Sequence, residues 1–195
     1  MKMMRIGLLT TTAVVSLAIG ISSCARPPEL QARQARSALG DLRDVAKAPL
    51  WAADEFAAAE AAVKAADREL SAQKGRAFLT RDYDKAEQMY VMAMQDITRA
   101  RQAAQDGKQT AEKQAREALD AALSAIGHAQ AAITIAPVRG SDDLLDRELD
   151  RAATRLNDVR NMIAAEKYGE AAQRAEEILE QVTLLLRNVR SGARR

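Results

Sequence analysis

Alanine fills the long segments of this chain that lack proline and glycine, and it limits the fold more than any other feature. Residues 57–62 read Ala-Ala-Ala-Glu-Ala-Ala, which combines high helix propensity with side chains small enough for helices to approach closely. Aromatic residues are only 3% of the chain, so it has little large apolar surface to bury. The sequence therefore predicts an all-α protein: elongated antiparallel helical hairpins or a bundle, with one very long central helix.

Apolar residues at helical spacing predict the individual helices. Pro49 divides the first helix from the second, Gly75 is a predicted C-cap residue and Asp82 a predicted N-cap residue. The third segment would be roughly 80 Å long if unbroken, but Gly107 lies in a polar stretch where the helix could kink or break. The expected helices span residues 29–47, 50–74, 83–135, 142–166 and 168–190.

Two of the predicted helix pairs look like copies of one unit. Phe56, Val63, Ala66 and Leu70 align with Leu149, Leu156, Val159 and Ile163, and Tyr83, Ala86, Met94 and Ile97 align with Tyr168, Ala171, Leu179 and Val182. Any two amphipathic, alanine-rich helices align tolerably at some offset, which is the alternative to true repetition. The repeat interpretation gives a domain over 49–190 with units 50–105 and 142–190, joined by 106–141, and a disordered basic tail over 191–195.

The two units differ in the length of the turn between their helices. Between the two helices of the first unit the chain is longer, because residues 71–82 stand where the second unit has only residues 164–167. The first unit therefore has an insertion in its turn.

The start of the chain has the layout of an export signal. Basic residues precede an apolar stretch that ends at Ile21. The sequence Ile-Ser-Ser-Cys that closes this stretch resembles the lipobox cut by lipoprotein signal peptidase. That resemblance implies cleavage between Ser23 and Cys24 and lipidation of the Cys24 thiol, which would anchor the mature protein to a membrane.

Two other interpretations of this N-terminus are open. An ordinary secretory signal would leave Cys24 as a free thiol. A retained membrane-spanning helix is disfavoured, because the apolar stretch is shorter than the ~20 residues that cross hydrocarbon and contains several threonines. Cys24 is the only cysteine, so an intrachain disulfide is impossible. On the lipoprotein interpretation, residues 1–23 are the signal peptide and residues 24–48 are a lipid-anchored tether with a short helix.

Removing the signal peptide changes the charge of the chain. The sequence has 29 Lys and Arg against 27 Asp and Glu, and residues 1–23 contain Lys2 and Arg5 but no acidic residue. The mature side chains are therefore balanced, which argues against nucleic acid as a partner. Ala25 follows the cysteine where an aspartate would resemble the inner-membrane retention signal of enteric bacteria. The expected location is the outer membrane, with the protein facing the periplasm.

Two sequence motifs carry a family resemblance. Residues 48–56 read Ala-Pro-Leu-Trp-Ala-Ala-Asp-Glu-Phe, and residues 82–87 read Asp-Tyr-Asp-Lys-Ala-Glu. With the lipobox, they resemble a family of alanine-rich bacterial envelope lipoproteins known only as a domain of unknown function, sometimes found beside peptidoglycan-binding domains. The Tyr-x-x-Ala start of the third and fifth helices is similar to the tetratricopeptide repeat, although these helices are too long for that family. The resemblance implies an envelope location and proximity to peptidoglycan, and no known chemistry.

Residue types that carry catalysis or bind metals are poorly placed in this sequence. His128, the only histidine, lies in the predicted long helix with no nucleophile motif nearby. The acidic residues between 142 and 150 lack the alternating spacing and the loop glycine of a calcium site, and they suit the first turn of a helix. No catalytic residue, cofactor or metal site is therefore predicted.

The few aromatic residues are the candidate interaction residues. They are Trp51, Tyr83, Tyr90 and Tyr168, with Phe56 beside the first of them. Packing in the core is the simpler role for such rings, and an exposed Trp51 would favour a partner or glycan site. The expected function is a non-enzymatic, membrane-anchored helical spacer or interaction scaffold that contacts a protein partner or another copy of itself. The alternative is a helical-repeat binding module for a periplasmic protein or cell-wall partner.

Overall fold

A computed structural model of the chain describes residues 26–135 and 142–192. Ser23, Cys24 and the rest of the predicted signal lie outside the described residues. Within them the backbone is helical and contains no strand, so the all-α prediction is confirmed. None of these helices is long and apolar enough to cross a bilayer. The elements are α1 (Glu29–Asp44), α2 (Ala48–Trp51), α3 (Ala53–Lys74), the 3-10 turn η1 (Phe78–Thr80), α4 (Asp84–Ile135), α5 (Asp142–Ala164) and α6 (Tyr168–Gly192).

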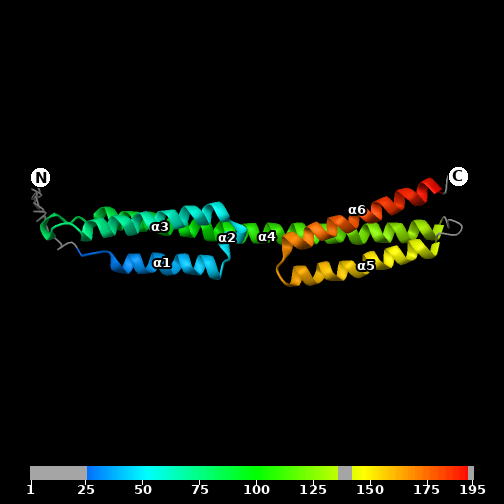
Figure 1. Cartoon of the computed structure of the whole chain (residues 1–195), viewed down its shortest axis with the longest axis horizontal. Coiled ribbons are helices and arrows are strands. Elements are labelled where there is room, and N and C mark those ends of the chain that lie inside the picture. Colours follow the sequence, from blue (N-terminus) through cyan, green and yellow to red (C-terminus); the bar gives the residue numbers. More distant parts are fainter. Residues whose placement is uncertain (1–25, 136–141, 193–195) are drawn as a thin grey trace, which may run out of the picture.

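The helices form a rod whose axis is α4 (Figure 1). This helix has 52 residues and is about 78 Å long at 1.5 Å per residue. Helices α1 and α3 pack along its first half, and α5 and α6 along its second half. In each half the three helices run up, down and up, so the rod consists of two three-helix bundles in tandem that share one continuous helix. We call them the N-terminal and the C-terminal bundle.

Each bundle has its own core. Small alanines alternate with larger apolar residues, and three of the largest fully buried side chains in the N-terminal bundle are Leu42, Tyr90 and Ile97. In the C-terminal bundle the corresponding large side chains are Leu149, Leu156 and Ile178. Alanine at many core positions lets the helices lie close together, so a chain with few aromatic residues still builds two packed cores.

Each half of the rod contains three helices, one more than the two-helix unit that the sequence predicts. The hairpins α3–α4 and α5–α6 point the same way along the rod, as the alignment of the two units implies (Figure 1). However, the second half of α4 is also the first helix of the C-terminal bundle, with Ala115, Ala122 and Ala129 buried in its core. The segment 106–135 is therefore part of a bundle and not only a connection between units.

Several helix ends differ from the predicted ones. Helix α1 ends at Asp44 and α2 begins at Ala48, because Lys47 adopts a left-handed conformation with φ of 50°. Ala52, with φ of −152° and ψ of 62°, then separates α2 from α3. The predicted single helix over 50–74 is therefore two. At the other end of the chain, α6 continues to Gly192, two residues into the tail that was expected to be disordered.

The predicted cap of α3 is present, whereas α4 begins at Asp84, one residue later than predicted, so that Tyr83 takes the N-cap position and Asp82 precedes it. Gly75 is the C-cap residue of α3, although its φ of −73° is not left-handed. The Asp82 carboxylate accepts a hydrogen bond from the backbone N–H of Asp84 at 3.0 Å, which satisfies a free donor at the start of α4. Acidic residues in the first turn of α4, Asp84 and Glu87, add favourable charge at the positive end of the helix.

Candidate interaction site

The two bundles meet at a joint around Trp51. The indole is half buried and packs against the cores of both bundles. Its ring centroid lies 5.7 Å from that of Tyr168, at an interplanar angle of 41°. Tyr168 is the first residue of α6, so this ring pair joins the end of α2 to the start of the second helix of the C-terminal hairpin. Aromatic pairs at this separation contribute stabilisation beyond the burial of their apolar area.

Two residues in the left-handed conformation bring the chain to the joint. Lys47 has φ of 50° and Glu166 has φ of 59°. At Glu166 the backbone forms a Schellman motif, in which the N–H of Lys167 donates to the carbonyl of Met162 at 2.9 Å. Glycine or asparagine usually takes such positions, and another residue there costs about 1–2 kcal/mol.

The side chains of these two residues form an ion cluster with α4. Glu166 accepts a hydrogen bond from Lys108 at 2.7 Å, and Lys47 lies 3.7 Å from its other carboxylate oxygen. The hydrogen bond from Lys108 lowers the pKa of Glu166 and raises that of Lys108. All three groups are exposed enough for solvent to screen them, so the cluster contributes little to the stability of the protein.

Gly107 is the point of closest approach in the joint. A Cβ atom built on this residue would lie 2.3 Å from the carbonyl oxygen of Trp51 and 3.2 Å from its carbonyl carbon. Helix α4 continues through this position without a break. Of the alternatives that the sequence leaves open at Gly107, the break does not occur, and this glycine makes room for α2 against α4.

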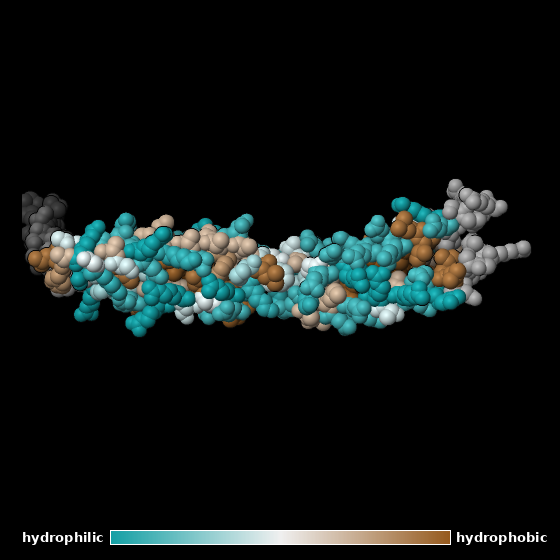
Figure 2. Space-filling model, viewed as in Figure 1, coloured by the Kyte–Doolittle hydropathy of each residue, from teal (hydrophilic) through white to brown (hydrophobic). Residues whose placement is uncertain are grey.

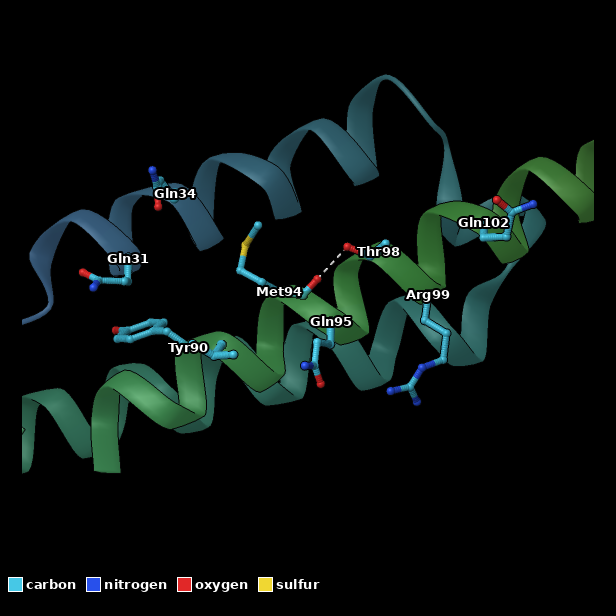
Figure 3. A pocket seen from close by; sticks show the side chains of 9 residues that line it. Gln31, Gln34, Tyr90, Met94, Gln95, Thr98, Arg99 and Gln102 are labelled. Atoms are coloured by element: carbon cyan, nitrogen blue, oxygen red, sulfur yellow. Dashed lines mark hydrogen bonds between the residues drawn. The ribbon is translucent and has the colours of Figure 1, made fainter. Parts of the chain in front are cut away.

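Two hollows follow the seam between α1 and α4. One, of about 750 Å³, lies at the joint and has Val45, Trp51 and Ala104 among its apolar lining and Arg101 and Lys108 among its charged lining. The other, of about 790 Å³, lies farther along the N-terminal bundle (Figure 3). Its lining consists of Gln31, Gln34, Tyr90, Val91, Met94, Gln95, Thr98, Arg99 and Gln102.

The second hollow is apolar at its base and largely uncharged at its rim. Gln31 and Gln34 project from α1, and Met94 extends from α4 into the space between the two helices (Figure 3). The Thr98 hydroxyl donates to the carbonyl of Met94 at 2.9 Å, so it is already satisfied within the helix. Amides around an apolar base suit an uncharged or amphipathic segment of another protein, and the hollow contains no nucleophile and base pair.

The structure gives the predicted aromatic residues packing roles. Only Trp51 and Tyr168 come together, at the joint. Tyr83 is 4% exposed near the turn between α3 and α4, and Tyr90 is fully buried in the N-terminal core. Phe56 is also buried, with the guanidinium of Arg43 5.4 Å above its ring. Their part in binding a partner stays a prediction.

Tyr90 is held in a polar network that ties three helices together. Its hydroxyl donates to Asp67 of α3, which also accepts hydrogen bonds from Arg36 of α1, at 2.7 and 3.1 Å. Burial alone would raise the pKa of Asp67, but the bonds from Arg36 and Tyr90 outweigh it and lower the pKa. Burial and the hydrogen bond to Asp67 raise the pKa of Tyr90 above its ordinary value of 10.0. The network fixes α1 onto the hairpin.

We expect Tyr90→Phe to lower the free energy of unfolding by about 1.5 kcal/mol, the contribution of a hydrogen bond to a charged group. Because folding raises the pKa of Tyr90, its stabilisation is complete below pH 10.0 and declines as the pH rises further. The variant should lack this alkaline decline. Urea titrations between neutral pH and about pH 11 measure both effects.

Tyr83→Phe is the matched control, because the Tyr83 hydroxyl is buried without a hydrogen-bond partner in the described residues. Its removal should leave stability unchanged or slightly higher. Equal losses from the two variants would contradict the network.

Several large apolar residues are exposed at positions that the sequence did not single out. Phe78 is 72% exposed and Leu79 is 92% exposed, both in η1. They lie in the insertion of the first turn, and this insertion is the one feature of the sequence that could have identified them. Val45 and Val91 are also exposed, beside the hollows of the α1–α4 seam.

Titratable groups in the described residues do not converge on a metal site: no cluster of three or more His, Cys, Asp or Glu side chains there could hold an ion. His128 is exposed on α4. Comparison of the chain with protein-family models, with curated proteins and with solved structures finds no match. Only the chemistry of their own residues therefore indicates what the joint and the α1–α4 seam could bind.

Proposed function

We propose that this protein is a non-enzymatic lipoprotein of the cell envelope, anchored to the outer membrane through Cys24. It acts as a periplasm-facing helical spacer or interaction scaffold. The anchor is supported by the sequence of residues 1–24, with its basic start, apolar stretch and lipobox. Two or more acyl chains on one cysteine would hold the protein firmly, since each buried methylene contributes ~0.8 kcal/mol.

The observation that carries the spacer role is the unbroken helix α4 shared by two bundles in line. A shared helix keeps the bundles collinear, whereas a flexible linker would let them fold back on each other. The chain also enters the rod at one end, because Glu29 at the start of α1 is paired with Lys74 at the end of α3. An anchor on Cys24 would then leave the whole length of the rod to project from the membrane, toward a protein partner or the peptidoglycan.

Self-association is not needed to cover the apolar face of α4. Its second half packs Ile126, Ala122 and Ala129 against α5 and α6 of the same chain. Leu123, at 37% exposure, is the one large exposed apolar residue of that half among the described residues. This favours a spacer that works as a single chain and meets its partners through its surface.

The anchor is tested by Cys24→Ser. This variant should keep its signal peptide and lose labelling by radioactive palmitate, because the hydroxyl cannot form the thioether that carries the diacylglyceryl group. Ser22→Ala is the matched control and should be cut and labelled normally. A Cys24→Ser protein that is processed and labelled like the natural one would refute the anchor.

The α1–α4 seam favours the alternative function, a binding module. Its two hollows are lined from α4 by Val91 and Gln102 in one case and by Gln105 in the other. A photo-crosslinker at Val91 that captured one envelope protein, with no capture from Leu123, would favour the module. Crosslinks at neither site would favour the spacer.

A further inference from the structure

The turn between α3 and α4 forms the end of the rod at which the chain enters. Besides the ion pair of Glu29 with Lys74, Gln31 of α1 donates to Glu87 of α4 at 3.2 Å, so the starts of α1 and α4 lie side by side there. Cys24 precedes Glu29 by five residues, which span at most roughly 18 Å when fully extended. A lipid on Cys24 would therefore hold this end of the rod, and not the other, at a membrane surface.

The same end presents large apolar side chains to solvent. Phe78 and Leu79 are 72% and 92% exposed, and Leu30 in the first turn of α1 is 62% exposed. Figure 2 shows hydrophobic colour at this end of the rod, as well as in patches near the opposite end and along the N-terminal bundle. The 3-10 turn holds Phe78 and Leu79 in place, since the N–H of Thr80 donates to the carbonyl of Ala77 at 2.9 Å. Packing within the described chain does not account for these side chains.

The charged residues around the turn indicate what kind of surface these apolar side chains would contact. Residues 74–81 contain Lys74, Arg76 and Arg81; Lys74 is paired with Glu29, and the next acidic residues along the chain are Asp82 and Asp84. The Arg81 side chain donates to the carbonyl of Arg76 at 3.0 Å, which holds two of these cations on one turn. Aromatic and leucine side chains flanked by Lys and Arg are the pattern of segments that enter the interface of an anionic bilayer.

We propose that the α3–α4 turn is a second membrane contact, in which Phe78 and Leu79 enter the lipid interface next to the acyl chains of Cys24 while Arg76 and Arg81 meet anionic headgroups. The proposal rests on the anchor proposed above for its placement at the membrane. A single lipid anchor would hold one point of the chain at the membrane. A second contact at the same end would also fix the orientation of the rod relative to the membrane. The insertion in the first turn thereby has a role that the shorter turn of the second unit lacks.

A tryptophan reporter tests the contact. The full chain, carrying Phe78→Trp with Trp51→Phe so that the reporter is the only indole, is isolated with its lipid and placed in vesicles of phosphatidylethanolamine and phosphatidylglycerol with brominated acyl chains. Emission should shift to the blue and be quenched. The matched reporter Leu123→Trp, in the same Trp51→Phe chain, lies in the other bundle and should keep water-like, unquenched emission.

Mass spectrometry of Cys24 separates this proposal from the anchor. A lipidated chain whose Phe78→Trp reporter stays water-like and unquenched would overturn the membrane contact and leave the anchor intact. A blue shift that appears without vesicles and grows with protein concentration would also overturn it, because the turn would then meet a second copy.

If Cys24 proves unlipidated, the anchor fails and the contact is tested on the unlipidated chain. Phe78→Ser and Leu79→Ser should then each lower vesicle binding by about tenfold. Leu184→Ser, at an exposed leucine in the other bundle, should leave binding unchanged. Unchanged binding in the two turn variants would refute the contact without reference to the anchor.

Discussion

Gly107→Ala is expected to lower the free energy of unfolding by about 1–2 kcal/mol. In an ordinary helix this substitution is stabilising by ~1 kcal/mol, because alanine has the higher helix propensity. At position 107 the added Cβ would lie 2.3 Å from the backbone oxygen of Trp51, which no side-chain rotation can move. Helix α2 or α4 would have to shift, and overpacking of this kind costs about 1–3 kcal/mol or more. The clash therefore outweighs the gain in propensity.

Gly127→Ala is the matched control, since Gly127 lies in the same helix and a Cβ there would have nothing within 4 Å. It should stabilise the protein by about 0.5–1 kcal/mol. Urea unfolding followed by circular dichroism measures both variants. The predicted result is opposite signs, and two variants stabilised to the same extent would mean that α2 does not lie against α4.

Trp51→Ala is expected to cost about 3 kcal/mol, at the lower end of the range for deleting a large aromatic side chain because the indole is half buried. Its second effect is on cooperativity. Trp51 contacts both cores and packs on Tyr168, so its loss leaves α4 as the main connection between the bundles. We expect the natural chain to unfold in one transition and the variant in two, with hydrogen exchange in α5 and α6 of the variant no longer tracking exchange in α1 and α3.

Leu42→Ala is the comparison variant for cooperativity, because Leu42 is fully buried in the N-terminal core and is not part of the joint. It should cost about 2–5 kcal/mol and keep one transition. A Trp51→Ala protein that unfolds in one step, with both bundles protected equally, would contradict the role of Trp51 as the link between them.

The helices were predictable because their apolar residues recur at helical spacing over many turns. The positions Phe56, Ala59, Val63, Ala66 and Leu70 are all buried, as that spacing requires. The length of α4 was also predictable, although not its continuity. Gly107 looks like a helix breaker in sequence, and only the carbonyl of Trp51 beside it shows why a glycine stands there.

The joint could not be predicted, because its local signals were absent or misleading. Lys47 and Glu166 are left-handed although neither residue type favours that conformation, so the end of α1 and the sharp turn after α5 gave no glycine signal. The contact of Trp51 with Tyr168 joins residues far apart in sequence. The sequence predicts the second half of α4 as a helix but not as the first helix of the C-terminal bundle, because its core residues are mostly alanine, which gives only a weak indication of a buried face.

The candidate surfaces were predictable only in part. Aromatic residues were chosen for their chemistry, but Tyr83, Tyr90 and Tyr168 are buried. Phe78 and Leu79 do not belong to a periodic segment, so helical periodicity does not indicate them. The sequence feature that could have identified them is an apolar pair within an insertion, outside any helical pattern.

The most direct test of the account is the distance across the joint. Spin labels at Gln88→Cys and Ser124→Cys, in a chain with Cys24→Ser, lie on exposed positions of α4 in different bundles. They are about ten full turns apart and therefore on one face of the helix. Pulsed electron resonance should give one narrow distance distribution centred at about 54 Å. A broad distribution, or one centred well below that distance, would mean that the rod bends at the joint and cannot act as a rigid spacer.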